Sequence, residues 1–369
     1  MRTAVISDLH LGLTSGGDVL RDPGVRSVLL EEIGDADRVV LLGDAVELRE
    51  LPLGQAMERA RPFFEELGAA LGDRPVTLVP GNHDHRFAEP LLDDLSLRGE
   101  PLGLERTHPP TPGPTATIDA WLGPAPLQIA YPGLWLRDDL YATHGHYMDA
   151  HLTLPRAECV AVAAAARISG PVPDPAGPAE YERLVRPLYG LGFGVAQVRR
   201  GAGKRNQARA SEAAWEALAG AADGGRRRRL AASAAQAAFP AAIWGVNRLL
   251  RSRFEADVSG QAIFHGGLAA ATEMSRRLGL GGVDVITGHS HRAGPLAEEG
   301  SWPLPGGGRL HNTGSWVFAS AFHLPGRPPN PYWPGTVTWV EDSEPPRRAQ
   351  LLHEHSHDAL SELLERAAD

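Results

Sequence analysis

Residues 38–44 read RVVLLGD, a β-branched apolar run that ends in a glycine and an aspartate. The same arrangement occurs twice more, because TAVIS at 3–7 precedes DLH, and PVTLV at 75–79 precedes PGNHD. Short apolar runs bounded by Gly or Pro are typical of buried strands. Each of the three predicted strands therefore ends beside residues that carry oxygen or imidazole groups.

Amphipathic stretches separate these predicted strands. Residues 23–33 and 54–71 carry apolar residues at helical spacing. Strands that alternate with helices favour βαβ units and a largely parallel sheet covered on both faces. In such sheets the loops at the carboxyl ends of the strands form the site. The sequence therefore predicts an α/β fold whose polar motifs gather at one edge of the sheet.

The rest of the α/β pattern is less regular. Residues 99–126 are dense in Pro and Gly and are predicted to form a loop. Residues 283–287 (VDVIT) restore the strand pattern just before His289. Other short strands are expected at 127–131, 134–136, 139–143, 309–318 and 336–340.

A segment of different character interrupts this pattern. Residues 151–260 are rich in Ala and Arg, poor in β-branched runs, and broken at 169–178 by SGPVPDPAGP. We interpret the segment as an inserted helical cap, in which Pro240 is expected to kink or break a helix. The predicted organisation is a catalytic α/β domain over 1–150, the cap over 151–260, and the rest of the catalytic domain with the C-terminal tail over 261–369.

Composition limits the class of protein. The 369 residues are 43% hydrophobic and carry a net charge of -9, which disfavours a nucleic-acid binder with a basic face. The single cysteine, Cys159, excludes an internal disulfide and a cysteine-built metal site, and fits a reducing compartment. The first polar motif begins at Asp8 and leaves no room for a signal peptide. A cytoplasmic location is therefore expected.

Five motifs carry the chemistry. They are DLH at 8–10, GD at 43–44, GNHD at 81–84, HGH at 144–146 and GHSH at 288–291. Mixed Asp, Asn and His donors suit Mn²⁺, Fe or Zn²⁺, whereas an all-oxygen set suits Mg²⁺ or Ca²⁺. A two-cation site needs a bridging carboxylate and a water that becomes hydroxide at neutral pH. Asp44 ends a buried strand and is the expected bridge.

In this order the five motifs resemble those of the calcineurin-like metallophosphoesterase family, over residues 1–151 and 262–339. The resemblance implies a four-layer α/β sandwich and a metal-dependent phosphoric ester hydrolase in which a metal-bridging hydroxide attacks phosphorus. It also implies two divalent cations, with Mn²⁺ favoured and Fe or Zn²⁺ as alternatives. One cation would bind Asp8, His10, Asp44 and His291, and the other Asp44, Asn82, His144 and His289.

The same resemblance implies a catalytic pair. His83 would contact the phosphate and protonate the leaving group, and Glu47 lies where the family often places an acidic partner for that histidine. In protein phosphatases of the family an arginine follows this acidic residue. Leu48 takes its place here, which weakens an assignment as a protein phosphatase. Arg86 and His146 are the candidate substrate-binding residues, Arg86 because guanidinium matches the geometry of phosphate.

Several functions stay open at this stage. The main expectation is a phosphoesterase acting on a small-molecule phosphate mono- or diester, with no nucleic-acid partner. The arginine block at 226–229 precedes an apolar helical stretch, and this pattern fits either a packed cap or a membrane-surface helix. A cap-gated pyrophosphatase or phosphodiesterase acting on a nucleotide-lipid or phospholipid is thus one alternative. A non-catalytic scaffold with the same fold is the other.

The chain is also similar to UDP-diacylglucosamine pyrophosphatases, through DLHL at 8–11, the Gly-Asp pair with Glu47, and the helical insert. It departs from that subgroup at His83, where those enzymes commonly carry arginine, and at 144–146, where HGH replaces HGD. The sequence therefore does not assign that substrate.

Overall fold

The computed structural model describes residues 1–198, 226–318 and 330–367. Within these ranges, eleven strands join into one mixed sheet. The strands are β1 (Thr3–Ile6), β2 (Arg38–Leu42), β3 (Val76–Val79), β4 (Glu105–His108), β5 (Leu127–Arg137), β6 (Leu140–Thr143), β7 (Asp284–Thr287), β8 (Trp302–Pro303), β9 (Arg309–Asn312), β10 (Thr336–Val340) and β11 (Arg347–Gln350). Their spatial order is β11-β10-β1-β2-β3-β5-β6-β7-β9-β8, and β4 pairs with β5 outside this path.

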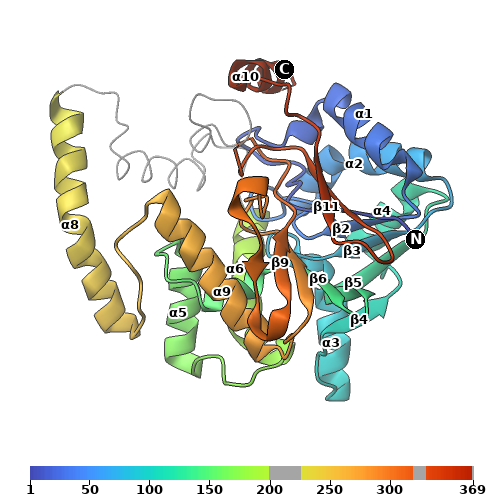
Figure 1. Cartoon of the computed structure of the whole chain (residues 1–369). Coiled ribbons are helices and arrows are strands. Elements are labelled where there is room, and N and C mark those ends of the chain that lie inside the picture. The colour runs from blue at the N-terminus through green and yellow to red at the C-terminus, as the bar shows by residue number, and fades with distance from the viewer. Residues whose placement is uncertain (199–225, 319–329, 368–369) are drawn as a thin grey trace.

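The long strand β5 divides the sheet into two halves (Figure 1). Residues 127–129 of β5 pair in parallel with β3, whereas residues 133–137 pair antiparallel with β6. Strands β1, β2 and β3 run parallel in the first half. Strands β6, β7 and β9 run parallel in the second half.

An apolar layer fills the space between the two half-sheets. Val40 and Leu42 of β2 cluster there with residues of the second half such as Ala142 and Ile286. Val39 and Leu41, the alternate residues of β2, belong instead to the larger cluster beneath the helices. Because side chains of a strand alternate between its two faces, this split shows that each half-sheet is covered on both sides.

Helices form the two outer layers (Figure 1). The first half-sheet packs against α1 (Pro23–Glu32), α2 (Leu53–Leu71), α4 (Pro114–Leu122) and α10 (His357–Arg366). The second packs against α5 (Ala157–Ser169), α6 (Pro178–Val198) and α9 (Gly260–Arg277). The predicted α/β sandwich of four layers is therefore confirmed. Short helix α3 (Glu89–Arg98) packs beside Tyr131 of β5.

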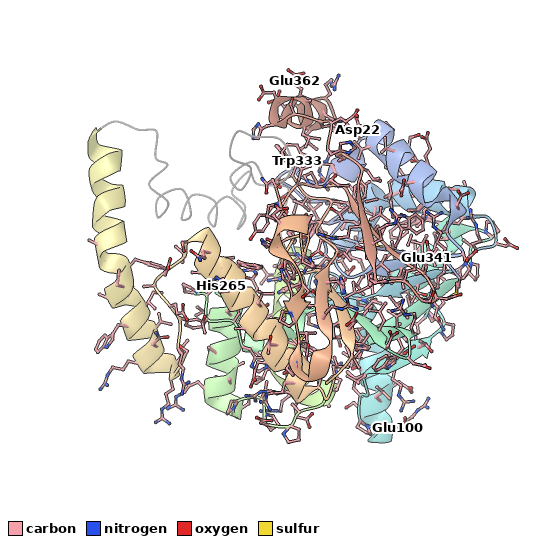
Figure 2. All side chains as sticks on the ribbon, in the orientation of Figure 1. Asp22, Glu100, His265, Trp333, Glu341 and Glu362 are labelled. Carbon is pink, nitrogen blue, oxygen red and sulfur yellow. The ribbon has the colours of Figure 1, made fainter. Side chains whose placement is uncertain are left out.

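Local sequence signals fix several of these elements. Asp22, labelled in Figure 2, precedes α1. Its side chain accepts a hydrogen bond from the backbone N–H of Val25 at 3.0 Å. Pro23 occupies the first helical position, where a missing N–H removes no hydrogen bond. Trp333, also labelled in Figure 2, is buried. Its indole N–H donates to the carbonyl of Leu352 at 2.9 Å.

The structure corrects three local predictions. Residues 99–126 are not one loop, because they contain β4 and α4. The Pro- and Gly-rich signals mark only the ends of α4, whose Ile118 and Leu122 are buried. The strands expected at 127–131 and 134–136 are one continuous strand, β5. The strand expected at 309–318 ends at Asn312, whose side-chain oxygen accepts from the Gly314 N–H and turns the chain.

Part of the predicted insert packs against the second half-sheet. Residues of α5 and α6, such as Val162 and Tyr181, share one apolar cluster with Tyr141 and Val285 of the second half-sheet. Helix α8 (Arg226–Leu250) lies at the edge of the molecule in Figure 1. It continues through Pro240, so the chain does not break there, and the alternative of a kink stays a prediction. The division into a catalytic domain and a cap stays a prediction. The side chains of the 226–229 arginine block lie outside the described residues.

Within the described ranges, no helix combines the length and the apolar character needed to cross a membrane.

Candidate metal centre

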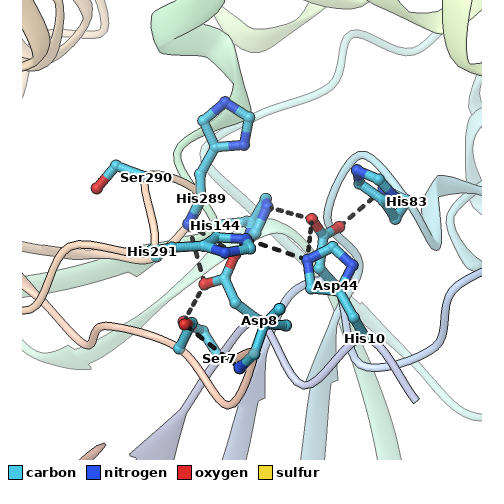
Figure 3. A network of polar contacts seen from close by, with 12 residues as sticks. Ser7, Asp8, His10, Asp44, His83, His144, His289, Ser290 and His291 are labelled. Carbon is cyan, nitrogen blue, oxygen red and sulfur yellow. Dashed lines mark hydrogen bonds and ion pairs between the residues drawn. The ribbon is translucent and has the colours of Figure 1, made fainter. Parts of the chain in front are cut away.

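Five loops bring the predicted metal ligands together at the carboxyl ends of strands from both half-sheets (Figure 3). These loops follow β1, β2, β3, β6 and β7. Six of the side chains are buried, and that of His291 is 32% exposed. The seven residues are Asp8, His10, Asp44, Asn82, His144, His289 and His291.

The ligands fall into two adjoining groups. Possible ligand atoms of Asp8, His10 and His291 lie within 4.8 Å of one another, and so do those of Asp44, His144 and His289. The Oδ2 atom of Asp44 is 3.6 Å from Nε2 of His10 and 3.2 Å from Nε2 of His144. One oxygen of Asp44 therefore lies between the two groups, as a bridging carboxylate would.

In the second group, polar contacts orient the two histidine rings. His144 donates from Nδ1 to the carbonyl of Leu42 at 3.0 Å, and its Nε2 lies 3.1 Å from Oδ1 of Asn82. His289 contacts the Asp149 carboxylate through Nε2 at 3.0 Å, and its Nδ1 lies 3.0 Å from the same Asn82 oxygen. Three atoms that could each bind a metal therefore converge on one place.

The first group has the same character. His10 contacts Oε2 of Glu47 through Nδ1 at 3.0 Å, and its Nε2 lies 3.2 Å from Nε2 of His291. Oδ1 of Asp8 is 3.3 Å from that His291 nitrogen. Imidazole nitrogens that converge with a carboxylate oxygen in this way suit a borderline divalent metal. The donor sets of both groups thus fit two divalent cations.

The amide of Asn82 gives a second test of this fit. Its Oδ1 atom faces the two imidazole nitrogens, whereas the opposite orientation would let the amide nitrogen donate to them and to Asp44. The orientation with the oxygen facing inward is the one that a cation requires. In that orientation the buried carbonyl oxygen would be the ligand, and the amide nitrogen would point away from the cation.

The backbone around the centre is unusual. Five of the predicted ligands have positive φ angles, a region sparsely populated by residues other than glycine. The φ angles are 53° at Asp8, 46° at His10, 53° at Asp44, 66° at His289 and 58° at His291. Arg251 is the one other such residue in the described part of the chain. Conformations of this kind cluster at functional sites, where the surrounding structure holds them in place.

Two glycines explain why the motifs read GD and GN. A Cβ atom on Gly43, whose φ is 86°, would lie 2.2 Å from Nδ1 of His144. A Cβ on Gly81 would lie 2.3 Å from Oδ1 of Asp44. Both positions therefore require glycine, because the ligands pack directly against the backbone.

Asp84 holds two of the ligand loops together. Its carboxylate accepts hydrogen bonds from the backbone N–H groups of Gly81 at 2.6 Å and Ala45 at 2.7 Å. Burial and the nearby charge of Asp44 raise the pKa of Asp84 to about 6. The sequence places Asp84 in a ligand motif, but only the structure shows that it supports the loops.

His83 and Glu47 lie next to the first group of ligands. Nδ1 of His83 is 2.6 Å from Oε2 of Glu47, and its backbone N–H donates to Oδ1 of Asp44 at 2.7 Å. Burial raises the pKa of Glu47, but the adjacent His83 and His10 outweigh that effect and hold the pKa below its usual range. The carboxylate is fully buried while the imidazole of His83 is 25% exposed. His83 is thus the member of the pair open to a ligand.

The two candidate substrate-binding residues lie in different surroundings. Arg86 is exposed, and its guanidinium lies over the ring of Phe193 at 5.7 Å from the ring centre. His146 is buried and contacts the Tyr131 hydroxyl at 3.2 Å through Nε2. The burial of His146 favours a supporting position behind His144. Substrate binding by either residue stays a prediction.

Sequence reasoning offered Asp149 only as a candidate substrate contact, and it missed Arg49. Asp149, five residues after His144, contacts His289 and fixes the protonation of that ring, as partners of metal-bound histidines do. Arg49 follows Glu47 by two residues and lies beside Asn82. The only sequence signal for either was proximity to a motif. Asn312 supports the loop that carries His289, because its amide donates to the Gly288 carbonyl at 2.7 Å.

Two adjoining groups of Asp and His side chains within a four-layer α/β sandwich are consistent with a binuclear metal site. Residues 1–165 match the model of the calcineurin-like phosphoesterase family, which confirms the sequence-based resemblance over the first of its two ranges. The matched range ends within α5, whereas His289 and His291 are supplied by a loop beyond it. A comparison with curated proteins gave no match.

Proposed function

We propose that the protein is a binuclear-metal-dependent phosphoesterase that hydrolyses a phosphate mono- or diester. The observation that carries this proposal is the convergence of Oδ1 of Asn82 with Nε2 of His144 at 3.1 Å and with Nδ1 of His289 at 3.0 Å. Mn²⁺ suits the mixed donor set best, with Fe or Zn²⁺ as the other metals that it fits. When bound, two such cations supply an activated water and neutralise charge on the phosphoryl oxygens.

His83 supplies the acid. Because Nδ1 of His83 is held by Glu47 at 2.6 Å, Nε2 is the nitrogen left to face a substrate. A protonated imidazole there can give its proton to the leaving oxygen, and the buried Glu47 carboxylate stabilises the cationic ring and fixes its orientation. The backbone contact between His83 and Asp44 places this acid at the edge of the metal centre.

Three further features belong to the proposal. The substrate is a small-molecule phosphate ester, which Arg86 and His146 help to bind. Residues 151–260 act as a cap over the catalytic domain, a view that the packing of α5 and α6 beside the site supports. The enzyme acts in the cytoplasm, in keeping with the single cysteine of the chain.

The first experiment compares hydrolysis of an aryl phosphomonoester with that of its diester. Each reaction contains purified protein with added Mn²⁺, and a parallel reaction contains a chelator. We expect turnover that the chelator abolishes and that Mn²⁺ restores. Turnover that persists in the chelator, or no turnover of either ester by protein shown to contain two Mn²⁺ per chain, would contradict the proposed function.

A further inference from the structure

Arg49 lies in the same loop as Asp44 and Glu47. Its backbone N–H donates to Oε1 of Glu47 at 2.9 Å, so the loop position of Arg49 is tied to the acid that supports His83. The Arg49 side chain is 19% exposed. A Cβ atom on Gly192 of α6 would lie 3.1 Å from Nε of Arg49, so the glycine leaves room for the guanidinium beside the helix.

The guanidinium faces another donor instead of an acceptor. Nη1 of Arg49 lies 3.2 Å from Nδ2 of Asn82, and both atoms carry hydrogens. If the Asn82 amide turned over, its oxygen would accept from Arg49, but that orientation would remove the oxygen from the metal position. When Asn82 directs its oxygen toward a cation, Nδ2 of Asn82 and Nη1 of Arg49 therefore lie side by side as two donors. An anion beside them would accept hydrogen bonds from both.

The protein itself neutralises Arg49 incompletely. Its recorded ion pair is with Glu158 of α5, whose Oε1 lies 3.4 Å from Nη2. Elsewhere in the fold, Arg186 contacts Glu89 at 2.6 Å and Arg26 contacts Glu66 at 2.7 Å. The longer contact with Glu158 involves Nη2 and leaves Nη1 available on the side that faces Asn82.

We propose that Arg49 binds the terminal phosphoryl group of the substrate, together with the amide of Asn82, and so makes the site select phosphomonoesters over diesters. This inference rests on the proposed function. A monoester presents three non-bridging oxygens and carries up to two negative charges, whereas a diester presents two such oxygens and one charge. A guanidinium that donates two hydrogen bonds in one plane therefore favours the monoester.

The test uses full-length protein with Mn²⁺ added and compares Arg49→Gln with Arg49→Lys. A matched control, Arg61→Gln, removes an arginine from an exposed ion pair with Glu65 on α2. For Arg49→Gln we expect kcat/KM for the aryl phosphomonoester to fall about 30–100-fold and that for the diester to fall less than about tenfold. Arg49→Lys should fall between wild type and Arg49→Gln, and Arg61→Gln should match wild type.

A second measurement does not depend on turnover. Calorimetric titration of inorganic phosphate into the Mn²⁺-loaded proteins should show a Kd at least about tenfold weaker for Arg49→Gln than for wild type. Metal content and thermal midpoint are measured on each variant to show that Arg49→Gln remains folded and loaded. If Arg49→Gln does not fold, Arg49→Lys serves in its place, with a loss of at least about threefold expected.

The outcomes separate this inference from the proposed function. Absence of turnover by loaded wild type rejects the proposed function, and the phosphate titration still decides the role of Arg49. Equal loss of monoester and diester activity in Arg49→Gln, unchanged phosphate affinity, or no phosphate binding by wild type would each overturn the inference.

Discussion

Two polar clusters lie close together in this protein, and their side chains are arranged differently. In the metal centre, nitrogen and oxygen atoms of His10, His144, His289 and their neighbours converge at 3.0–3.2 Å from one another, as atoms that share a cation would. In the second cluster, which we call the Glu182 cluster, His85 and two tyrosine hydroxyls are all directed at the carboxylate of Glu182.

The Glu182 cluster is complete without an added ion. Glu182 of α6 accepts from Tyr131 at 2.5 Å and from Tyr147 at 2.6 Å, and lies 3.0 Å from Nε2 of His85. Burial lowers the pKa of His85, but Glu182 and Glu89 outweigh it and raise the pKa to about 9. His85 is thus a cation paired with carboxylates. The comparison teaches that the pairing of donors with acceptors, more than residue type, distinguishes a metal site from a structural cluster.

The largest expected effect is the removal of the shared carboxylate from the metal centre. Asp44→Ala should lower kcat for the aryl phosphomonoester by about a thousandfold or more, since two metals each worth several kcal/mol of charge stabilisation depend on it. Metal analysis should show fewer than two Mn²⁺ per chain. Activity within tenfold of wild type, with Mn²⁺ supplied, would remove the distinction between the two clusters.

The matching change in the second cluster should affect stability instead. Glu182→Ala leaves the buried His85 cation without its main partner, which costs about 3–5 kcal/mol. The free energy of unfolding is measured in urea, and the Mn²⁺ content should stay at the wild-type value. Glu65→Gln, which removes one member of an exposed pair on α2, is the control and should cost less than about 1 kcal/mol. A loss of Mn²⁺ in Glu182→Ala would show that the clusters are not independent.

The Glu182 cluster also predicts a pH dependence. The pKa of His85 is raised from 6.5 to about 9. The contribution of His85 to the free energy of unfolding is therefore fully present below pH 6.5 and is lost as the pH rises through about 9. This contribution is about 3 kcal/mol. Glu89 of α3, Tyr131 of β5, Tyr189 of α6 and His146 also face His85.

The measurement is the difference in unfolding free energy between wild type and His85→Gln, taken at pH 6.5 and at pH 9.5. This difference isolates His85 from other groups that titrate in the same window. It should shrink as the pH rises. A difference that stays constant over this range would mean that His85 is not a buried cation, and that the second cluster is neutral.

The smallest expected effect is that of a chelator on stability. Removing bound Mn²⁺ present at 100 times its Kd should cost about 2.7 kcal/mol. For a chain of 369 residues the thermal midpoint should then fall by about 3–4 °C. Glu182→Ala should show the same shift as wild type, whereas Asp44→Ala should show less. A thermal midpoint of wild type that does not change when the chelator is added would argue that the metal centre holds no cation.

Much of the fold was predictable from short patterns. The strands expected at 3–7, 38–42 and 75–79 correspond to β1, β2 and β3. These strands are buried on both faces, and this burial is the reason for their continuous apolar runs. The helices expected at 23–33 and 54–71 correspond to α1 and α2. The loop predicted at 99–126 failed because Pro and Gly also mark the ends of short elements. The break predicted at Pro240 failed because α8 continues through it.

The sequence by itself determined which residues could bind metal, because five short motifs each combine a donor with the end of a predicted strand. It places Gly43 and Gly81 in two of these motifs, and the structure shows why both must be glycine. These are local properties, since a strand end and its following loop lie within a few residues of each other.

Only the tertiary structure decided how these donors are oriented and supported. Asp149 and Arg49 act on His289 and Asn82, which lie far from them in the chain. Similarly, Glu182 reaches His85 across 97 residues of sequence. Hydrogen bonds of this kind depend on which surfaces the half-sheets and helices α5 and α6 bring together, and no local pattern specifies that packing.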